Sequence, residues 1–389
     1  MFKHITRTVW LLSLVSLLND FSSEMLYPVI PLYLKQIGYT TIIIGLLEGV
    51  AELIAGFSKI YMGRLSDSFQ RRLPFIQVGY LLSILSRPLV GFTASLALIF
   101  TGRSIDRIGK GIRSGARDAL LAEECQEENR AEVFGFHRSM DTAGAILGPL
   151  VAMVYLYFHP ADYRTIFIIT LAPGILASLC TFLLKEKTQD VVTVRSFSFR
   201  KNFSFYKEAP SSYLKFLGLL LLFGIANSSD MFLLLRAKET GLSEANVILL
   251  YMLFNLVYAV FAFPIGKLAD KYGRMNMLII GLIIYTITYL IFGYTQHIFM
   301  ISAAFIGYGL YYAFTQSTLK ALLLERVDAS QKSSAIGFYE GVNSFFLLGS
   351  NALAGWVWYQ FGATSMFTYS SVIAFIVLLL MIRQSKSTA

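Results

Sequence analysis

Apolar segments long enough to cross a lipid bilayer follow one another along almost the whole chain. A spanning helix needs about 20 mostly apolar residues. We expect about twelve such segments, near positions 8–34, 41–63, 73–93, 96–121, 132–158, 164–184, 213–235, 244–266, 276–295, 298–324, 333–359 and 366–383. Runs of this length satisfy their backbone hydrogen bonds internally as helices, whereas a β-barrel has shorter, alternating segments. The pattern therefore predicts an all-α integral membrane protein.

The composition agrees with this prediction. A soluble domain has about 25% charged residues, whereas this chain of 389 residues has 15% charged and 56% hydrophobic residues. The net charge of +9 lies in the connections between apolar segments, so nucleic acid is not an expected partner. The expected partners are the lipid bilayer, protons and a small-molecule substrate, and we expect a monomer. Cys125 and Cys180 have no metal-ligand spacing, so no metal or cofactor is expected.

Basic residues concentrate in alternate connections and indicate the orientation. Arg64, Arg71 and Arg72 follow the second segment, and Lys267, Lys271 and Arg274 follow the eighth. The positive-inside rule then places both termini, and the polar stretch 185–212, on the cytoplasmic side of the cell inner membrane. In the first segment, Pro28 and Pro31 are expected to kink the outer end.

The second half of the chain repeats the first at a shift of about 203 residues. Gly63-Arg64-Leu65-Ser66-Asp67 closes the second segment, and Gly266-Lys267-Leu268-Ala269-Asp270 closes the eighth. Lys35 and Gly38 correspond to Lys238 and Gly241. We therefore expect two six-helix bundles in the same orientation, at 1–184 and 213–389, joined by a cytoplasmic linker at 185–212.

The repeated sequence resembles the signature loop of the major facilitator superfamily. The second copy, Gly266 to Arg274, follows the family pattern Gly-x-Leu-x-Asp-x-x-Gly-Arg, whereas the first copy has Gln70 in place of the second glycine. The resemblance covers the whole chain. It implies that the loop aspartates lock one transport state, with a gating set formed by Gly63, Asp67, Arg71, Arg117, Asp118, Gly266, Asp270 and Arg274.

A second family pattern lies on the fifth segment. Gly135, Gly144, Gly148 and Pro149 are similar to the glycine-proline motif of proton-driven exporters, although Ala152-Met153 replaces the usual glycine pair. Small residues at this spacing allow two helices to approach closely. The motif favours a bacterial, drug-exporter-like branch of the family.

Ionisable side chains within the apolar segments are concentrated in the first half. Asp20 and Glu24 share one face of the first helix, and Glu48 is on the second. The fourth segment carries the densest set, Arg103, Asp106, Arg107, Lys110, Arg113, Arg117 and Asp118. Charges at membrane depth are costly and usually functional. The resemblance implies that the first, fourth, seventh and tenth segments line one central cavity.

Three interpretations of these charges remain open. The acids neutralise the cations in a permanent network, or Asp20, Glu24 and Glu48 carry a coupling proton, or the fourth segment holds an anionic group, for which arginine is well suited. The third interpretation gives a substrate site formed by Arg103, Asp106, Arg107, Lys110, Asn227, Asp230, Tyr311 and Glu340. The residues from the second half contribute a mostly neutral, aromatic wall.

The first functional hypothesis is a secondary active transporter that exports a small organic solute by proton-coupled antiport. The alternative is a proton-coupled importer of an anionic solute, such as an organic acid or a carboxylate siderophore, and the charged fourth segment favours it. A non-transporting membrane receptor is a more remote alternative. No nucleophile motif, phosphate loop or metal cluster in the sequence indicates an enzyme.

Overall fold

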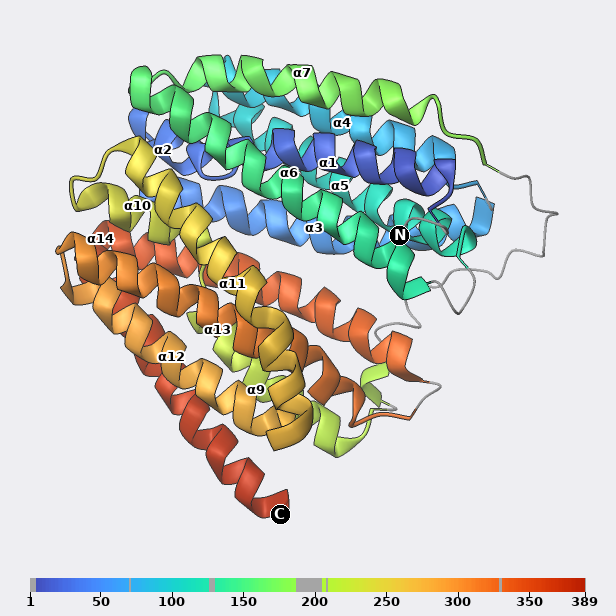
Figure 1. Ribbon diagram of the computed structural model, residues 1–389. Helices are drawn as coiled ribbons and strands as arrows, with labels where there is room; N and C mark the ends of the chain where they lie inside the picture. The colour runs from blue at the N-terminus through green and yellow to red at the C-terminus, as the bar shows by residue number, and fades with distance from the viewer. Residues whose placement is uncertain are drawn as a thin grey trace. The chain divides into compact units, whose positions relative to one another are not determined.

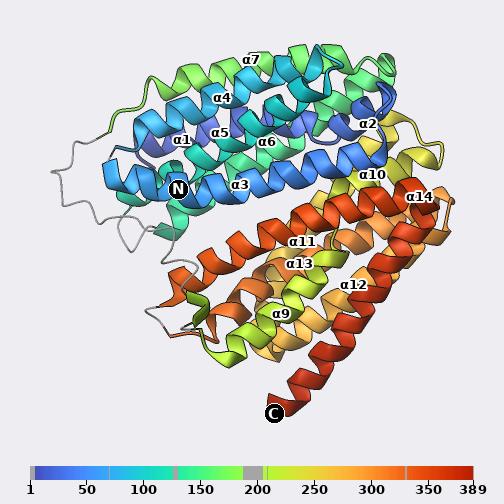
Figure 2. The ribbon, with the colours of Figure 1, turned by 180° about the vertical axis from the view of Figure 1, so that it is seen from behind.

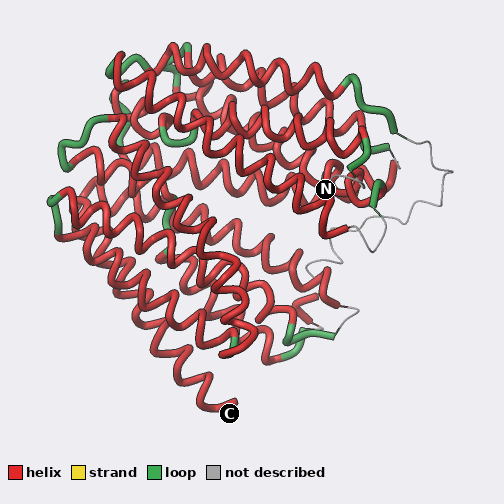
Figure 3. Tube along the Cα trace, viewed as in Figure 1, coloured by secondary structure: helices red, strands yellow, loops and turns green. Residues whose placement is uncertain are grey.

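In the computed structural model, all regular elements among the described residues are helices, joined by loops and turns, which confirms the predicted all-α class (Figures 1 and 3). The structure describes residues 5–69, 71–125, 130–186, 205–207, 209–328 and 331–388. For 59–60, 62–69, 130–132, 317, 332–334 and 385–388 only the backbone is described. Most of the expected linker at 185–212 therefore lies outside the described residues.

Contacts divide the chain into two units. The first comprises Met1–Tyr33 and Val50–Phe197, and the second comprises Leu34–Gly49 and Ser198–Ala389. The residues at 34–49, which precede and begin a long helix of the first half, thus pack with the second unit. Gly45 shows how closely, because a Cβ there would collide with the carbonyl oxygen of Asn351.

The first half consists of α1 (Arg7–Leu26), α2 (Val29–Gln36), α3 (Thr41–Phe69), α4 (Leu73–Gly91), α5 (Leu96–Glu123), α6 (Arg130–Phe158) and α7 (Tyr163–Thr181). Within the first unit, α1 packs along α6 and α7, and α4 packs along α5 (Figure 1). This arrangement brings the charged face of α5 and the polar face of α1 into one bundle.

The second half consists of α9 (Ser211–Ala226), α10 (Asp230–Glu239), α11 (Glu244–Tyr272), α12 (Arg274–Tyr294), α13 (Ile298–Leu324) and α14 (Lys332–Thr388). Helix α13 packs against α11 and α12, and α9 packs along α14 (Figure 2). Helix α14 bends at Gly362, whose φ is 84°. The bend separates the eleventh and twelfth predicted segments.

Nine helices of the described chain are long and apolar enough to cross a membrane, and α14 counts as one of them. Helices α1 and α5 are not in this set. They carry the polar residues that the sequence singles out, among them Asp20 and Glu24 on α1 and the arginines of α5. Hydropathy alone thus does not identify α1 and α5, the two most polar helices of the first half. Their positions in the repeat identify them as spanning segments.

The first spanning segment of each half is interrupted at the same place. Helix α1 ends at Leu26 and α2 begins at Val29, while α9 ends at Ala226 and α10 begins at Asp230. In the first half, Tyr27 keeps helical dihedral angles, and Pro28 interrupts the hydrogen-bond pattern because it has no backbone N–H. In the second half, the side chain of Ser229 accepts a hydrogen bond from Met231 N at 3.3 Å and starts a new helix.

The short helices α2 and α10 end alike and hold the end of a neighbouring helix. Gly38 and Gly241 follow them with φ values of 95° and 87°, a conformation that favours glycine. The Tyr33 hydroxyl donates to Gly91 O at 3.2 Å, at the end of α4. Arg236 donates to Phe292 O at 2.8 Å, at the end of α12. Tyr33 and Arg236 are 203 residues apart, which is the shift of the sequence repeat. The repeat is therefore also seen in equivalent contacts made by single residues.

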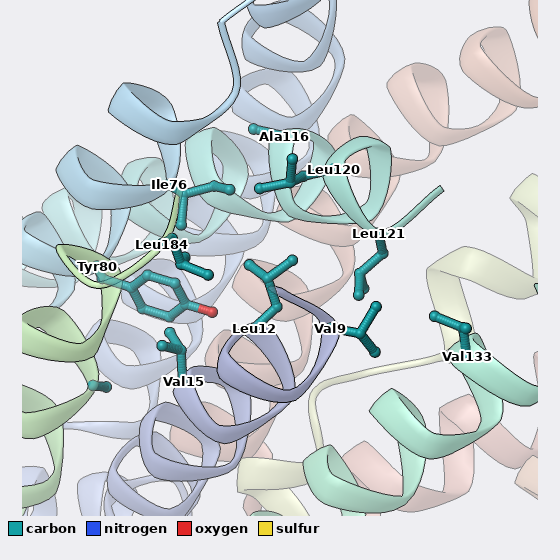
Figure 4. Packing of buried hydrophobic residues seen from close by; sticks show 11 residues of the cluster. Val9, Leu12, Val15, Ile76, Tyr80, Ala116, Leu120, Leu121, Val133 and Leu184 are labelled. Atoms are coloured by element: carbon teal, nitrogen blue, oxygen red, sulfur yellow. The ribbon is translucent and has the colours of Figure 1, made fainter. Parts of the chain in front are cut away.

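A hydrophobic cluster fixes one end of the first unit (Figure 4). Val9, Leu12 and Val15 of α1 meet Ile76 and Tyr80 of α4, and Leu120, Leu121 and Val133 complete the cluster from α5 and α6. All of these side chains are buried. This packing fixes the rotation of α1 and α5 and so decides which polar side chains meet.

Candidate functional site

The buried arginines of α5 form the first part of the candidate site. Arg103, Arg107 and Arg113 are each 6% exposed. Arg107 Nη2 lies 3.6 Å from Glu52 Oε1 of α3. Arg113 Nη1 lies 2.6 Å from the Ser83 hydroxyl of α4. Arg107 and Arg113 of α5 thus contact polar side chains of α3 and α4.

Asp106 lies within the electrostatic reach of four arginines, namely Arg107, Arg103, Arg113 and Arg87. The four arginines outnumber Asp106 and Glu52, which leaves an excess of positive charge in this part of the unit. Lys110, on the same helix, is exposed. The arrangement suits an anionic group, because guanidinium groups bind carboxylates and phosphates in a bidentate manner.

Arg87 of α4 is a buried cation that sequence analysis did not assign to a site. It is 4% exposed, and its Nη1 donates to Thr170 O of α7 at 2.7 Å and to the Ser22 hydroxyl of α1. Arg87 thus joins three helices of the first unit. An arginine in the middle of an otherwise apolar segment was the available signal.

The second part of the site is an ion network around Arg117. Its Nη1 lies 2.8 Å from the Ser16 hydroxyl of α1 and 4.0 Å from Asp141 Oδ2 of α6. Its Nη2 lies 2.9 Å from Asp118 Oδ1. His137, also on α6, has Nε2 3.7 Å from the same oxygen of Asp141. Three helices thus meet through one cation and two acids.

The three acids predicted to carry protons are placed in different surroundings. Asp20 accepts a hydrogen bond from Asn19 Nδ2 at 3.2 Å, and the charges of Asp141, Glu24, Lys110 and Arg117 act on it. Glu24 follows one turn later on α1 and is half-buried. Glu48 is 2% exposed and belongs, by its contacts, to the second unit. Asp20 is therefore the acid nearest to the Arg117 network.

The glycines of α6 set how closely that helix approaches α1. A Cβ on Gly144 would collide with the carbonyl oxygen of Leu17, and one on Gly148 would collide with that of Phe21. Gly135 has open space around it. Pro149 lies within α6, which continues through it to Phe158. Only the central pair of glycines makes the close contact.

The signature loops hold the same ion pair in both halves. Arg72 Nε lies 3.3 Å from Glu123 Oε1, and Arg274 pairs with Glu325. Arg274 Nη2 also lies 2.9 Å from Asp270 Oδ1. Each pair joins the start of one helix to the end of the next, and both are 51 residues apart. The two glutamates were not predicted, because only packing shows that these helix ends meet.

The remaining predicted gating residues are less informative. Arg71 is exposed, and Gly266 lies within α11. The side chain of Asp67 and the surroundings of Gly63 lie outside the described residues, although both positions are within α3.

The second unit has a carboxylate in an aromatic cluster. Asp230, the first residue of α10, accepts hydrogen bonds from the hydroxyls of Tyr308 at 2.5 Å and Tyr312 at 3.2 Å. The ring of Phe254 of α11 packs at a steep angle against both tyrosines, with ring centroids 5.4 Å from Tyr308 and 5.7 Å from Tyr312. Tyr311 is 2% exposed and packs edge to face on Tyr285, with ring centroids 4.8 Å apart. The predicted aromatic wall therefore surrounds an acid.

The other predicted substrate residues of the second unit are Asn227 and Glu340. Asn227 is at the interruption between α9 and α10. Glu340 Oε1 lies 3.0 Å from Lys320 Nζ. In the part of the chain that the structure describes, no group of three His, Cys, Asp or Glu residues is placed to hold a metal ion.

Comparison with known proteins shows the family to which the chain is similar. The family model of the Major Facilitator Superfamily matches residues 12–236 and 216–388. An uncharacterized MFS-type transporter of Methanocaldococcus jannaschii is 32% identical over 382 residues, covering 96% of this chain and 94% of the relative. The multidrug resistance protein MdtH of Salmonella newport is 23% identical over 324 residues, covering 81% and 77%. A mutant of the nucleoside transporter NupG has the same fold, with a TM-score of 0.84 at 14% identity over 97% of this chain and 99% of that chain.

Proposed function

Because the chain belongs to the major facilitator superfamily, we propose that it exports a small organic solute in exchange for protons. The observation that carries this proposal is the position of Asp20 in the first unit. This carboxylate lies at membrane depth among two other acids, Asp141 and Glu24, and two cations, Lys110 and Arg117.

A network with a purely structural role would satisfy each buried acid with its own cation, because an unpaired buried charge is costly. Asp20 instead shares Arg117 with Asp141 and Asp118. A proton on one of the acids relieves their mutual repulsion, and its departure restores that repulsion. The network is therefore suited to bind and release a proton, with Asp20 and Glu24 as the proposed carriers. We propose Glu48, which packs with the second unit, as a further carrier.

Export is supported by two observations. MdtH, a relative, carries the name of a multidrug resistance protein. The glycines at 144 and 148 hold α6 against the backbone of α1 next to Asp20, in the pattern that resembles proton-driven exporters. We propose a monomer in the cell inner membrane with both termini in the cytoplasm, and six-helix halves at 1–184 and 213–389 on either side of a linker.

Import of an anionic solute is the second candidate, and the arginines of α5 favour it. Arg103 and Arg107 are buried near the middle of α5, and the acid Asp106 lies between them in the sequence. A pocket for a neutral or cationic drug gains nothing from these cations. We propose that they bind the substrate, and that Asn227, Asp230, Tyr311 and Glu340 contribute from the second half.

Solid-supported membrane electrophysiology on proteoliposomes tests both candidates. We expect substrate-dependent currents from at least one member of a panel of organic acids and amphiphilic cations, and an imposed pH gradient should increase them. Arg107→Gln should abolish currents from acids and spare those from cations, with exposed Arg383→Gln as the control. Currents that ignore the pH gradient for every substrate would overturn proton coupling.

The direction of transport requires a separate measurement. Accumulation of the active compound in inverted membrane vesicles indicates export, and accumulation in intact cells indicates import. Equal behaviour of cells with and without the protein would contradict both directions.

A further inference from the structure

We infer that His137 and Asp141 of α6 form a second proton-binding site, one to two turns of α1 away from Asp20. The inference rests on the proposed proton coupling and identifies residues that the sequence did not assign to it. Both side chains are deeply buried, at 4% and 6% exposure. They lie four residues apart, so they share one face of α6.

The geometry places the imidazole between a hydroxyl and a carboxylate. His137 Nδ1 lies 3.3 Å from the Ser13 hydroxyl of α1. Its Nε2 lies 3.7 Å from Asp141 Oδ2, which is an ion-pair distance but too long for a hydrogen bond. If Nδ1 donates to Ser13, the neutral ring has an unprotonated Nε2 that faces the carboxylate. A proton added there produces an imidazolium beside its counter-ion.

Two atoms of this pair have unfilled hydrogen-bonding capacity. Neither His137 Nε2 nor Asp141 Oδ1 has a hydrogen-bond partner in the described part of the chain. A buried polar atom without a partner costs about 1–3 kcal/mol. A pair whose role was only to join helices would be expected to close this gap. A proton between the two side chains closes it by creating a charge-assisted hydrogen bond.

The surrounding charges make proton binding sensitive to the position of α5. Arg117 and Asp118 of α5 and Asp141 and Arg138 of α6 act on His137, and from α1 Asp20 acts on the same network through Asp141. Helix α7 carries one charged residue, Arg164, in its first turn and at the opposite end from His137.

His137 and Arg117 compete for one atom. Arg117 Nη1 lies 4.0 Å from Asp141 Oδ2, the oxygen that His137 Nε2 also faces. When His137 is protonated, its imidazolium pairs with this oxygen of Asp141, and Arg117 then interacts with Ser16, Asp118 and Asp20. Loss of the proton returns Asp141 to Arg117. The step is a proton transfer alone, because a neutral imidazole gains one proton and later gives it up.

The location suits a proton that travels to and from Asp20. Ser13 and Asp20 are seven residues apart on α1, which is about 10 Å along the helix. Ser16 and Arg117 lie between them. His137 is two turns from the start of α6, so the pair lies nearer to the α5–α6 connection than Asp20 does.

Protons themselves serve as the probe in the test. Wild-type proteoliposomes on a solid-supported membrane receive pH jumps without substrate, and the transient charge displacement is recorded against pH. We expect His137→Gln to remove a component of this displacement. Asp141→Asn should keep the component but move its midpoint to lower pH by about one unit, a tenfold change in proton affinity. Exposed His159→Gln should leave the curve unchanged.

A separate measurement does not depend on the folding of the variants. The wild-type chain has four histidines, and selective labelling with ¹⁵N allows the imidazole of His137 to be followed by NMR in nanodiscs. We expect one histidine signal to titrate together with the charge displacement. A His137 signal that stays constant while charge moves would overturn the inference.

The outcomes separate the inference from the proposed function. If wild-type protein moves charge and folded His137→Gln moves the same amount at the same pH, the second site is wrong and proton coupling remains. If wild-type protein moves no charge and ignores pH gradients, proton coupling is wrong and the second site is wrong with it.

Discussion

The two halves of the chain share the contacts that join helix ends and differ in their buried polar clusters. The ion pairs Arg72–Glu123 and Arg274–Glu325 occupy equivalent places. Away from these pairs, the first unit contains a network of arginines, acids and a histidine, whereas the second contains Asp230 among tyrosines. We propose that the repeated contacts stabilise the fold and that the two unlike clusters have different roles in transport.

The largest expected effect is on transport. Asp20→Asn should abolish the response of transport to a pH gradient while exchange of substrate continues, because the variant cannot exchange a proton. Asp230→Asn should retain that response and weaken substrate binding roughly tenfold, about 1.4 kcal/mol. Solid-supported membrane currents measure both, with exposed Asp328→Asn as the control. The reverse assignment of the two effects would break the proposed division of work.

The next effect concerns the two unlike residues that hold equivalent helix ends. Arg236→Met removes hydrogen bonds from a buried cation to Phe292 O and Thr295 O, and we expect a loss of about 3 kcal/mol in the free energy of unfolding. Tyr33→Phe removes a neutral donor, for which about 1 kcal/mol is expected. Unfolding in mixed micelles measures both, and equal losses would contradict this account.

Helix packing should give a smaller difference between the halves. Gly148→Val forces a side chain against the carbonyl oxygen of Phe21, and we expect a loss of about 2 kcal/mol in stability. At the corresponding position of the second half, Ser350 donates to Ile225 O at 3.0 Å, so Ser350→Ala should cost about 1 kcal/mol. Gly135→Val is the control because nothing lies near it. A cost at Gly135 that equals the cost at Gly148 would refute the steric explanation.

The smallest expected effect is a pH dependence of stability that arises at one turn of the first half. The Tyr155 hydroxyl donates to Asp162 Oδ2 at 2.6 Å and, together with hydrogen bonds from Thr165, holds the pKa of Asp162 below its ordinary value. A depressed pKa stabilises the fold above the unfolded-state pKa of about 4, and the contribution is lost as pH falls through the folded-state value.

The matching turn of the second half uses Gly362, which does not titrate. Tyr155→Phe should therefore reduce stability slightly at neutral pH, and the reduction should vanish in acid. Thermal unfolding between neutral and acidic pH checks this expectation. A deficit that persists unchanged in acid would show that Asp162 is not its source.

The fold could be predicted to a large extent from the sequence because bilayer spanning imposes length and hydropathy. The interruption at Pro28 was also predictable from the proline itself. The interruption between Ala226 and Asp230 was not, since Asn227 and Ser228 are compatible with a helix and the break depends on Ser229 and its surroundings.

The sequence predicted which residue types form the candidate site. It did not predict which of these side chains pair with one another. The cations of α5 are visible as charges in an apolar segment, and Asp230 likewise. Their partners depend on how each helix is rotated, which the packing around Leu12 and Tyr80 decides. Arg107 therefore pairs with Glu52 of α3, and Arg117 approaches Asp141 of α6. Sequence spacing within one helix carries no information on this rotation.

The contacts of Tyr33 and Arg236 bear on how a duplicated chain diverges. Both residues satisfy carbonyl groups at the end of the fourth-placed helix of their half, one with a phenol and the other with a guanidinium. Aligned letter by letter, the two positions look unrelated. After duplication, this position kept its role of hydrogen-bonding a helix end, while the residue that fills the role changed. Ancestry in such proteins is therefore better traced through the helix end that a residue stabilises than through the identity of the residue.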